Sequence, residues 1–157
     1  MVAWDDFAAA APEIAGKGRG LLERPAFGGA LLATVRDDLA PRVNPISLAI
    51  VNGRLLAFLI VGSGKVADLD ADGRYALHAH QEPAIPHEFQ VRGRAREITD
   101  PVARSAVAAG WKFEADDGYR LFEFSIEHAI FGERADPNDW PPVYASWKAG
   151  ALPPNTG

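Results

Sequence analysis

Residues 41–61, PRVNPISLAIVNGRLLAFLIV, contain two apolar runs joined by Asn52-Gly53. This dipeptide is the strongest short signal for a β-hairpin, because Asn and Gly both tolerate the positive φ angles of a two-residue turn. Pro45 lacks the N–H that a central strand needs, so the strand over 41–51 is expected at a sheet edge or a bulge. Residues 55–61 are all apolar, so both faces of the second strand, 54–61, are expected to be covered.

The flanking sequence extends this hairpin into a small antiparallel barrel. In residues 88–98, apolar and polar residues alternate, which is typical of a strand with one buried face. Asp100-Pro101 is an N-cap followed by Pro at the first helical position, and it predicts a helix over 101–110. Residues 16–20, with Gly at every second position, are expected to form a basic loop. The remaining expected elements are helices at 4–15 and 65–70 and strands at 28–36, 74–81 and within 120–133. The prediction is a mainly β fold with about six strands and three short helices.

Composition narrows the class of protein. The chain has 157 residues, which fits one domain. Its formal net charge of −5 argues against nucleic acid as a partner, and the absence of Cys excludes disulfides and thiolate metal sites. The longest apolar run, Leu55 to Val61, is too short to span a membrane, and the N-terminus carries acids where a signal peptide needs Lys or Arg. We therefore expect a cytoplasmic protein.

The C-terminal residues differ from the rest of the chain. Residues 135–157 contain five Pro together with Trp140, Tyr144 and Trp147. We expect a barrel domain over 1–134, followed by an extended tail over 135–157 that docks its aromatic side chains on the dimer.

Gly62-Ser63-Gly64-Lys65-Val66-Ala67 is the motif with the clearest chemistry. It matches the G-x-G-x-x-A pattern of dinucleotide sites, but its strand belongs to a hairpin, its helix is short and no second βαβ unit follows. The helix start still favours an anion, because its N–H groups are unpaired. Lys65 stands where the helix dipole disfavours a cation, so either a bound anion compensates for it or its side chain extends into solvent.

Other charged clusters point to chemistry less clearly. Asp68-x-Asp70-x-Asp72-Gly73 resembles the start of an EF-hand loop, but position 12 is Ala79, so calcium is rejected. Spacing assigns no metal site to the histidines, and no G-x-S-x-G elbow supports a catalytic triad. The basic stripe on 88–98 is expected to be solvated or to form an interface. These residues are His78, His80 and His87, and Arg92, Arg94 and Arg96.

Taken in order, three stretches resemble the pyridoxamine 5′-phosphate oxidase-like family. They are ALLATVRDDLAPRVNPISLAI (30–50), GRLLAFLIVGSGKVADLDADGRYALHAH (53–80) and EFQVRGRAREITD (88–100). The resemblance covers roughly residues 25–132 and implies a six-stranded antiparallel split β-barrel. It departs from the family's better-known phosphate sites in one respect, since only Lys65 is basic at the helix start.

The resemblance also implies a cofactor and a partner. The family pattern implies an FMN-dependent oxidoreductase that is a homodimer with the flavin at the subunit interface, acting on a small molecule that the sequence does not identify. The alternatives are an F420-dependent reductase and a non-catalytic flavin- or haem-binding protein, with no catalytic residue assigned in any of them. Ser63 and Lys65 would hold the phosphate, the ring system would lie near Asn44, Pro45, Ile46, Leu59 and Ile60, and a partner chain could contribute Trp147 and Lys148.

Overall fold

The computed structural model describes residues 1–26 and 28–151. This part of the chain contains four helices and nine strands. The helices are α1 (Trp4–Ala10), α2 (Pro12–Leu22), α3 (Gly64–Ala71) and α4 (Pro101–Ala109). The strands are β1 (Ala30–Val35), β2 (Pro41–Ile46), β3 (Ala49–Val51), β4 (Arg54–Ile60), β5 (Arg74–Ala79), β6 (Glu88–Glu97), β7 (Tyr119–Phe124), β8 (His128–Glu133) and β9 (Val143–Lys148).

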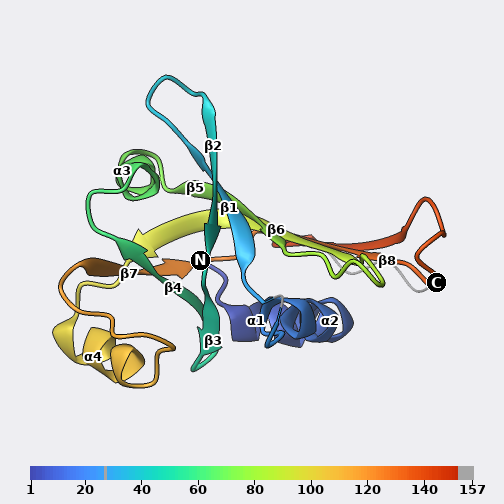
Figure 1. The fold of residues 1–157 in the computed structure, drawn as a ribbon, viewed down its shortest axis with the longest axis horizontal. Coiled ribbons are helices and arrows are strands. Elements are labelled where there is room, and N and C mark those ends of the chain that lie inside the picture. The colour runs from blue at the N-terminus through green and yellow to red at the C-terminus, as the bar shows by residue number, and fades with distance from the viewer. Residues whose placement is uncertain (27, 152–157) are drawn as a thin grey trace.

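The strands form one antiparallel sheet that curls around a core (Figure 1). Its order is β2-β1-β5-β6-β7-β4-β3, and β8 joins β6 to β9. The long strand β6 pairs with two strands along one edge, and this divides the barrel into two parts. Residues 88–92 pair with β8, and residues 95–97 pair with β7. Ser125 N–H donates to Arg94 O between those two pairings, so β7 and β8 follow one edge of β6 in succession. The split β-barrel that the sequence predicts is confirmed.

The hairpin between β3 and β4 has the predicted geometry. Asn52 and Gly53 have φ angles of 49° and 70°, as this type of two-residue turn requires. Asp5 N–H donates to Gly53 O at 3.0 Å, so α1 is attached to the turn. β2 is an edge strand, which accommodates Pro45 as predicted.

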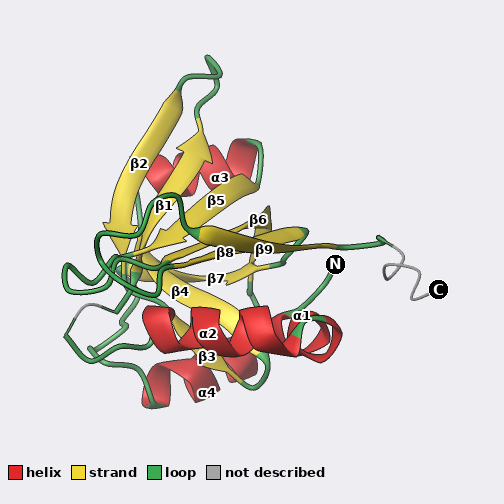
Figure 2. Ribbon diagram, turned by 90° about the vertical axis from the view of Figure 1, so that its right-hand side faces the viewer, coloured by secondary structure: helices red, strands yellow, loops and turns green. Residues whose placement is uncertain are grey.

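β4 is covered on both faces by its own chain. Leu55, Ala57 and Leu59 belong to the main core inside the barrel. Leu56 and Phe58 belong to a second core cluster, which includes Val107 of α4. Figure 2 shows the sheet between α3 on one side and the helices α1, α2 and α4 on the other. The covering that the apolar sequence requires therefore comes from within the chain.

The expected loop over residues 16–20 was wrong, because these residues lie inside α2. The single helix expected over 4–15 is two helices, and Pro12 starts the second at a position where its missing N–H costs nothing. A Cβ added at Gly18 would lie 2.3 Å from the ring of the buried Phe89. Gly18 thus lets α2 approach β6 closely, and this packing outweighs the low helix propensity of three glycines.

The expected count of six strands was too low. Residues 41–51 divide into β2 and β3 at Ser47-Leu48, and residues 119–133 form both β7 and β8. The third addition is β9, which pairs with β8 in a part of the chain that was expected to be irregular. The tail residues 152–157 lie outside the described part of the chain.

Candidate functional site

The start of α3 presents unpaired backbone donors. The first hydrogen bonds of the helix run from Val66 N–H and Ala67 N–H to Ser63 O, at 3.1 and 3.2 Å. The N–H groups of Gly64 and Lys65 precede these bonds and have no intrahelical acceptor. Ser63 does not cap the helix with its side chain, because its hydroxyl donates to Ile60 O at 2.8 Å. The helix start is therefore open to an anionic ligand.

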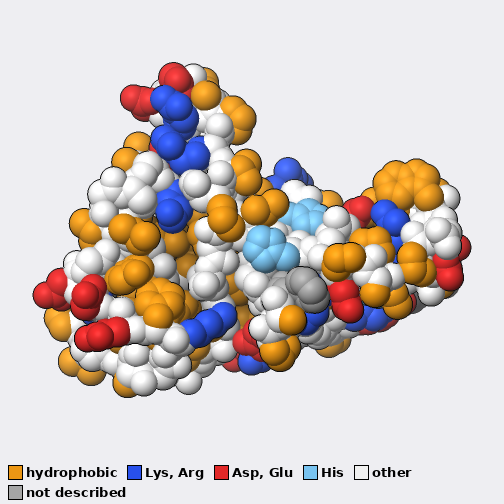
Figure 3. Space-filling view, viewed as in Figure 1, with side chains coloured by type: hydrophobic (Ala, Val, Ile, Leu, Met, Phe, Trp, Pro, Cys, Tyr) orange, Lys and Arg blue, Asp and Glu red, His pale blue; other side chains and the backbone are white. Residues whose placement is uncertain are grey.

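Arg42 brings a second cation to this helix start. A Cβ added at Gly64 would lie 2.5 Å from Cζ of Arg42, so the guanidinium lies directly against the glycine backbone. Arg42 Nε donates to Asp68 Oδ2 at 2.8 Å, and within the described chain its Nη1 and Nη2 atoms have no hydrogen-bond acceptor. Figure 3 shows Lys and Arg side chains gathered over β2 and beside α3.

Asp68 holds Arg42 in place. This carboxylate is buried and also accepts a hydrogen bond from Thr34 Oγ1 at 2.7 Å. Burial acts to raise the pKa of Asp68, but the hydrogen bonds from Arg42 and Thr34 and the nearby positive charges leave it below its usual range. The ionised Asp68 thus fixes the Nε side of the guanidinium and leaves the Nη side for a ligand.

Sequence reasoning did not assign Arg42 to the site. It lies 22 residues before Gly64 in the chain, and only the folding of β2 beside α3 brings the two together. The available signal was Arg42 within the Pro-Arg-Val-x-Pro stretch that carries the family resemblance. The structure thus places a second basic residue at the helix start, where the local sequence offers only Lys65.

The residues predicted to lie along a cofactor ring occupy three environments. Asn44 and Ile46 alternate with Arg42 on one face of β2, whereas Pro45 is exposed on the opposite face. Ile60, which is 55% exposed, lies next to Ser63. Leu59 is only 2% exposed and packs in the main core. The structure therefore places Ile60 beside the start of α3 and Asn44 two residues from Arg42 on the same face of β2, whereas Ile46 and Leu59 pack in the main core.

Trp147 and Lys148 lie on β9, which is separated from β2 by the width of the sheet. The Trp147 ring packs 5.1 Å from the ring of Phe7, between centroids, and is half-buried. Lys148 is exposed and stands opposite His128 of β8. Within one chain, neither residue meets the start of α3, so their predicted role depends on a second copy.

The acidic residues of the EF-hand-like stretch all bind arginine. Asp68 binds Arg42, Asp70 binds Arg120 at 2.7 Å, and Asp72 binds Arg74 at 2.6 Å. The hydrogen bond from Arg74 is the main cause that lowers the pKa of Asp72 to about 2. No group of three His, Asp or Glu residues that could hold a metal ion is present in residues 1–26 and 28–151.

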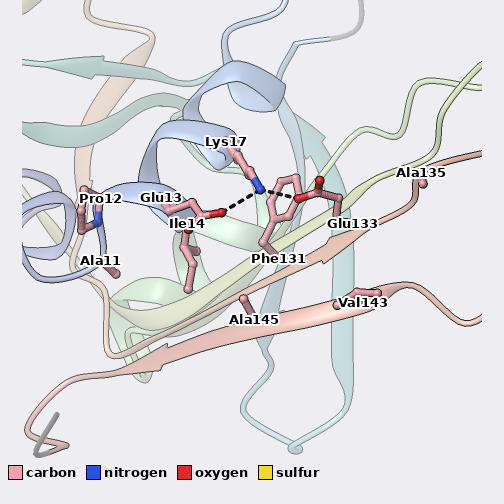
Figure 4. A pocket seen from close by; sticks show the side chains of 10 residues that line it. All are labelled: Ala11, Pro12, Glu13, Ile14, Lys17, Phe131, Glu133, Ala135, Val143 and Ala145. Atoms are coloured by element: carbon pink, nitrogen blue, oxygen red, sulfur yellow. Dashed lines mark hydrogen bonds and ion pairs between the residues drawn. The ribbon is translucent and has the colours of Figure 1, made fainter. Parts of the chain in front are cut away.

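A separate groove lies between α2 and the β8–β9 hairpin (Figure 4). Its volume is about 710 Å³, and its lining is mostly apolar. Lys17 reaches across it from α2 to Glu133 of β8 and also binds Glu13 at 3.0 Å. Because both glutamates already neutralise Lys17, the groove offers no free cation for a phosphate. The lining residues are Ala11, Pro12, Glu13, Ile14, Lys17, Phe131, Glu133, Ala135, Val143 and Ala145.

Comparison with known protein families gives a match over residues 19–131 to the sequence model described as pyridoxamine 5′-phosphate oxidase. The chain belongs to the pyridoxamine 5′-phosphate oxidase-like family. The match includes α3, β2 and every residue of the candidate site except Trp147 and Lys148. Comparison with curated protein sequences gives no match.

Solved structures share the fold of this family member at low sequence identity. General stress protein 26 from Bacillus anthracis str. Sterne is 14% identical, with a TM-score of 0.59, over 83% of this chain and 95% of that one. A putative pyridoxamine 5′-phosphate oxidase from Lactobacillus delbrueckii is 20% identical, with a TM-score of 0.60, over 72% and 89%. A heme binding protein from Mycobacterium smegmatis is 12% identical, with a TM-score of 0.62, over 83% and 57%. No helix in the described residues is long and apolar enough to cross a membrane.

Proposed function

We propose that this chain binds FMN and acts as a flavin-dependent oxidoreductase on a small molecule. The observation that carries the proposal is the convergence of four groups at the start of α3. These groups are the N–H of Gly64, the N–H of Lys65, the Nη side of Arg42 and the side chain of Lys65, which stands in the first turn of the helix. Together they match a phosphate dianion in charge and in hydrogen-bonding capacity.

The site residues fit a phosphate in shape as well as in charge. Gly64 has no side chain, so the space above the helix start is left to the Arg42 guanidinium and a ligand. Asp68 is directed at Nε of Arg42, and Lys65 makes no ion pair within the described chain. Arg42 therefore lies against the helix start, held in position by a buried carboxylate, and Lys65 in the first turn supplies a second positive charge.

A flavin bound here would supply the hydride or electron transfer, and the protein would bind, orient and shield it. Asn44 offers an amide beside Arg42 on the same face of β2, and Ile60 offers an apolar surface beside Ser63. No side chain of the described site stands out as a proton donor or acceptor for a substrate. We therefore assign binding and orientation, but no acid or base, to these residues.

A homodimer is part of the proposal. Ile60 and Val61 are large apolar side chains exposed next to Ser63, and Leu31 and Val43 are exposed on the outer face of β1 and β2. A second copy that covers these residues would exclude water from the flavin ring. The contribution of Trp147 and Lys148 from that second copy remains a prediction.

The test is the visible spectrum of the purified protein, with mass spectrometry of the released cofactor and titration of the apoprotein with FMN. We expect one FMN per chain, and Lys65→Ala should weaken FMN binding by about 10- to 100-fold because a charge-assisted phosphate contact is lost. Lys112→Ala is the matched control, since Lys112 is exposed in the segment after α4.

The other possible outcomes would assign a different function or contradict the proposal. Released F420, a deazaflavin that also carries phosphate, would assign the alternative reductase, and a haem spectrum would assign a haem-binding protein. A colourless protein that binds neither FMN nor F420, or equal FMN affinity in the Lys65→Ala variant, would contradict the proposal. Sedimentation of the loaded protein as a single chain would contradict the shared interface.

A further inference from the structure

The groove between α2 and the β8–β9 hairpin has the size and the apolar walls of a small-molecule site. Its volume of about 710 Å³ lies within the roughly 300–1,000 Å³ that such sites occupy. Figure 4 shows Ile14 of α2 directed toward Ala145 of β9, and the Phe131 ring beside Lys17. Val143 also lines the groove and is 77% exposed, so a ligand there would remove apolar surface from water.

The groove lies on the opposite face of the sheet from the surface that the proposed homodimer covers. Phe131 stands opposite the buried Phe89 in the β6–β8 pairing, so both side chains are on the face toward α2. Gln90, the next residue of β6, aligns with His78 and Leu31 on the outer face. The groove also uses none of the β9 residues assigned above to a partner's flavin, so it is independent of that interface.

The charged side chains of the groove already hold one ammonium group. Lys17 Nζ binds Glu13 Oε1 at 3.0 Å and also Glu133 Oε2, and it lies 5.8 Å from the centroid of the Phe131 ring. The hydrogen bond to Glu133 is the main cause that raises the pKa of Lys17, and the same bond lowers the pKa of Glu133. An ammonium ion and a carboxylate are therefore both charged here at neutral pH.

The charges of the groove do not cancel. Among the described residues that line it, the ionisable side chains are one lysine and two glutamates, which leave one net negative charge. Lys17 binds one oxygen of each glutamate, and within the described chain Glu13 Oε2 and Glu133 Oε1 have no hydrogen-bond donor. An apolar groove with a net negative charge and free acceptors complements a ligand that has an apolar body and one positive charge.

We propose that this groove binds a small organic ammonium ion, with its apolar body packed on Ile14, Phe131 and Val143. The N–H groups of the ligand would donate to the free oxygens of Glu13 and Glu133. These two side chains are 82% and 49% exposed, so the cation reaches them without entering the core. The site is separate from the start of α3 and does not rest on flavin binding there.

The experiment compares three probes that share one apolar body and differ in charge: phenylbutylamine, phenylbutanol and phenylbutyrate. Each is titrated by calorimetry at pH 7 into the protein, saturated beforehand with FMN where FMN binds. We expect the amine to bind about 5- to 10-fold more tightly than the alcohol, a modest preference because both carboxylates are exposed, and the carboxylate to bind most weakly. Methyl NMR of Ile14, assigned from an Ile14→Val variant, places the bound probe in the groove.

Two variants change the charge of the groove in opposite directions. Lys17→Met keeps the length of the side chain but releases both glutamates, so the amine should bind several-fold more tightly. Glu13→Gln/Glu133→Gln should reduce the affinity for the amine to that for the alcohol, while the alcohol, which reports the shape of the groove, binds as before. Lys112→Met and Glu114→Gln, both in the segment after α4 and exposed, are the matched controls and should bind normally.

Three results would overturn the proposal. They are no saturable binding of the amine, equal affinities for the amine and the alcohol, and unchanged binding of the amine in the Glu13→Gln/Glu133→Gln variant. Ala145→Trp places a large side chain in the groove and should abolish binding of the amine and the alcohol. If it instead separates a dimer into single chains in sedimentation, the groove is a contact between copies and the small-molecule site is wrong. Failure of FMN to bind would contradict the proposed function but would leave the order of the three probes unchanged.

Discussion

Two arginine–carboxylate groups in this barrel differ in how many of the arginine donors are hydrogen-bonded within the described chain. On the sheet surface near α4, Glu123 accepts hydrogen bonds from Arg54 and Arg96, with three distances of 2.8–2.9 Å and a fourth of 3.0 Å. At the start of α3, Arg42 has one carboxylate behind it and no acceptor on its Nη side within the described chain. The first group is complete within the chain, whereas the second has room for a ligand.

This difference teaches how to separate structural from functional cations in a single chain. Both groups join elements far apart in sequence, and both contain a buried carboxylate. The number of donors left over distinguishes them, because unused guanidinium donors beside a helix start favour an anion. Substitutions in the complete group should change stability, and those in the open group should change ligand affinity.

Glu123→Gln should have the largest effect on stability. The substitution leaves Arg54 and Arg96 facing each other without the negative charge between them. We expect a loss of about 2 kcal/mol in the free energy of unfolding, less than the roughly 3–5 kcal/mol of a fully buried pair, because both arginines reach solvent. Urea denaturation measures the loss. FMN affinity should be unchanged, and a parallel loss of affinity would show that the two groups are not independent.

Arg42→Gln should affect both properties, because Arg42 belongs to the ligand site and also neutralises Asp68. We expect FMN affinity to fall by about tenfold or more and the free energy of unfolding to fall by about 1–2 kcal/mol. Adding Asp68→Asn removes the unpaired charge and should restore most of the stability but not the affinity. Recovery of affinity in the double variant would contradict a direct contact between Arg42 and the phosphate.

Two glycine substitutions also separate an effect on stability from an effect on ligand affinity, because each adds a Cβ in a different environment. A Cβ at Gly64 would meet the end of the flexible Arg42 side chain, whereas a Cβ at Gly18 would meet the Phe89 ring in the core. Gly18→Ala should therefore cost about 1–2 kcal/mol of stability despite its gain in helix propensity. Gly64→Ala should leave the midpoint of thermal unfolding nearly unchanged but weaken FMN binding several-fold, as titration of both apoproteins would show.

Local signals predicted the parts of the fold that depend on neighbours in sequence. Asn52-Gly53 fixed the hairpin, Asp100 caps α4 by accepting from Ala103 N–H at 3.0 Å, and the alternation in 88–98 identified the buried face of β6. Gly18 could not be placed in a helix from sequence, because its reason is contact with Phe89, 71 residues later. Tertiary contact reversed the local preference there.

The candidate site was predictable to the same extent. Ser63 and Lys65 could be assigned to the start of α3 because helix starts and glycines leave a local signature, but the hydrogen bond from the Ser63 hydroxyl to Ile60 O could not be predicted. Arg42 was not assigned, because its role depends on the position of β2 beside α3.

The smallest expected effect is the pH dependence of the stability that Glu123 contributes through Arg54 and Arg96. The hydrogen bonds from Arg54 are the main cause that lowers the pKa of Glu123, with burial acting against them and Arg96 adding to them. A depressed pKa contributes stability above the ordinary Glu pKa, and this contribution is lost as the pH falls through the lower value in the folded protein. The difference in unfolding free energy between the wild type and Glu123→Gln should thus narrow, by on the order of 1 kcal/mol, from pH 7 to pH 3. Because all other carboxylates are common to both proteins, urea denaturation of the pair at each pH separates Glu123 from the rest. A constant difference across this range would mean that Glu123 acts through packing rather than through its charge.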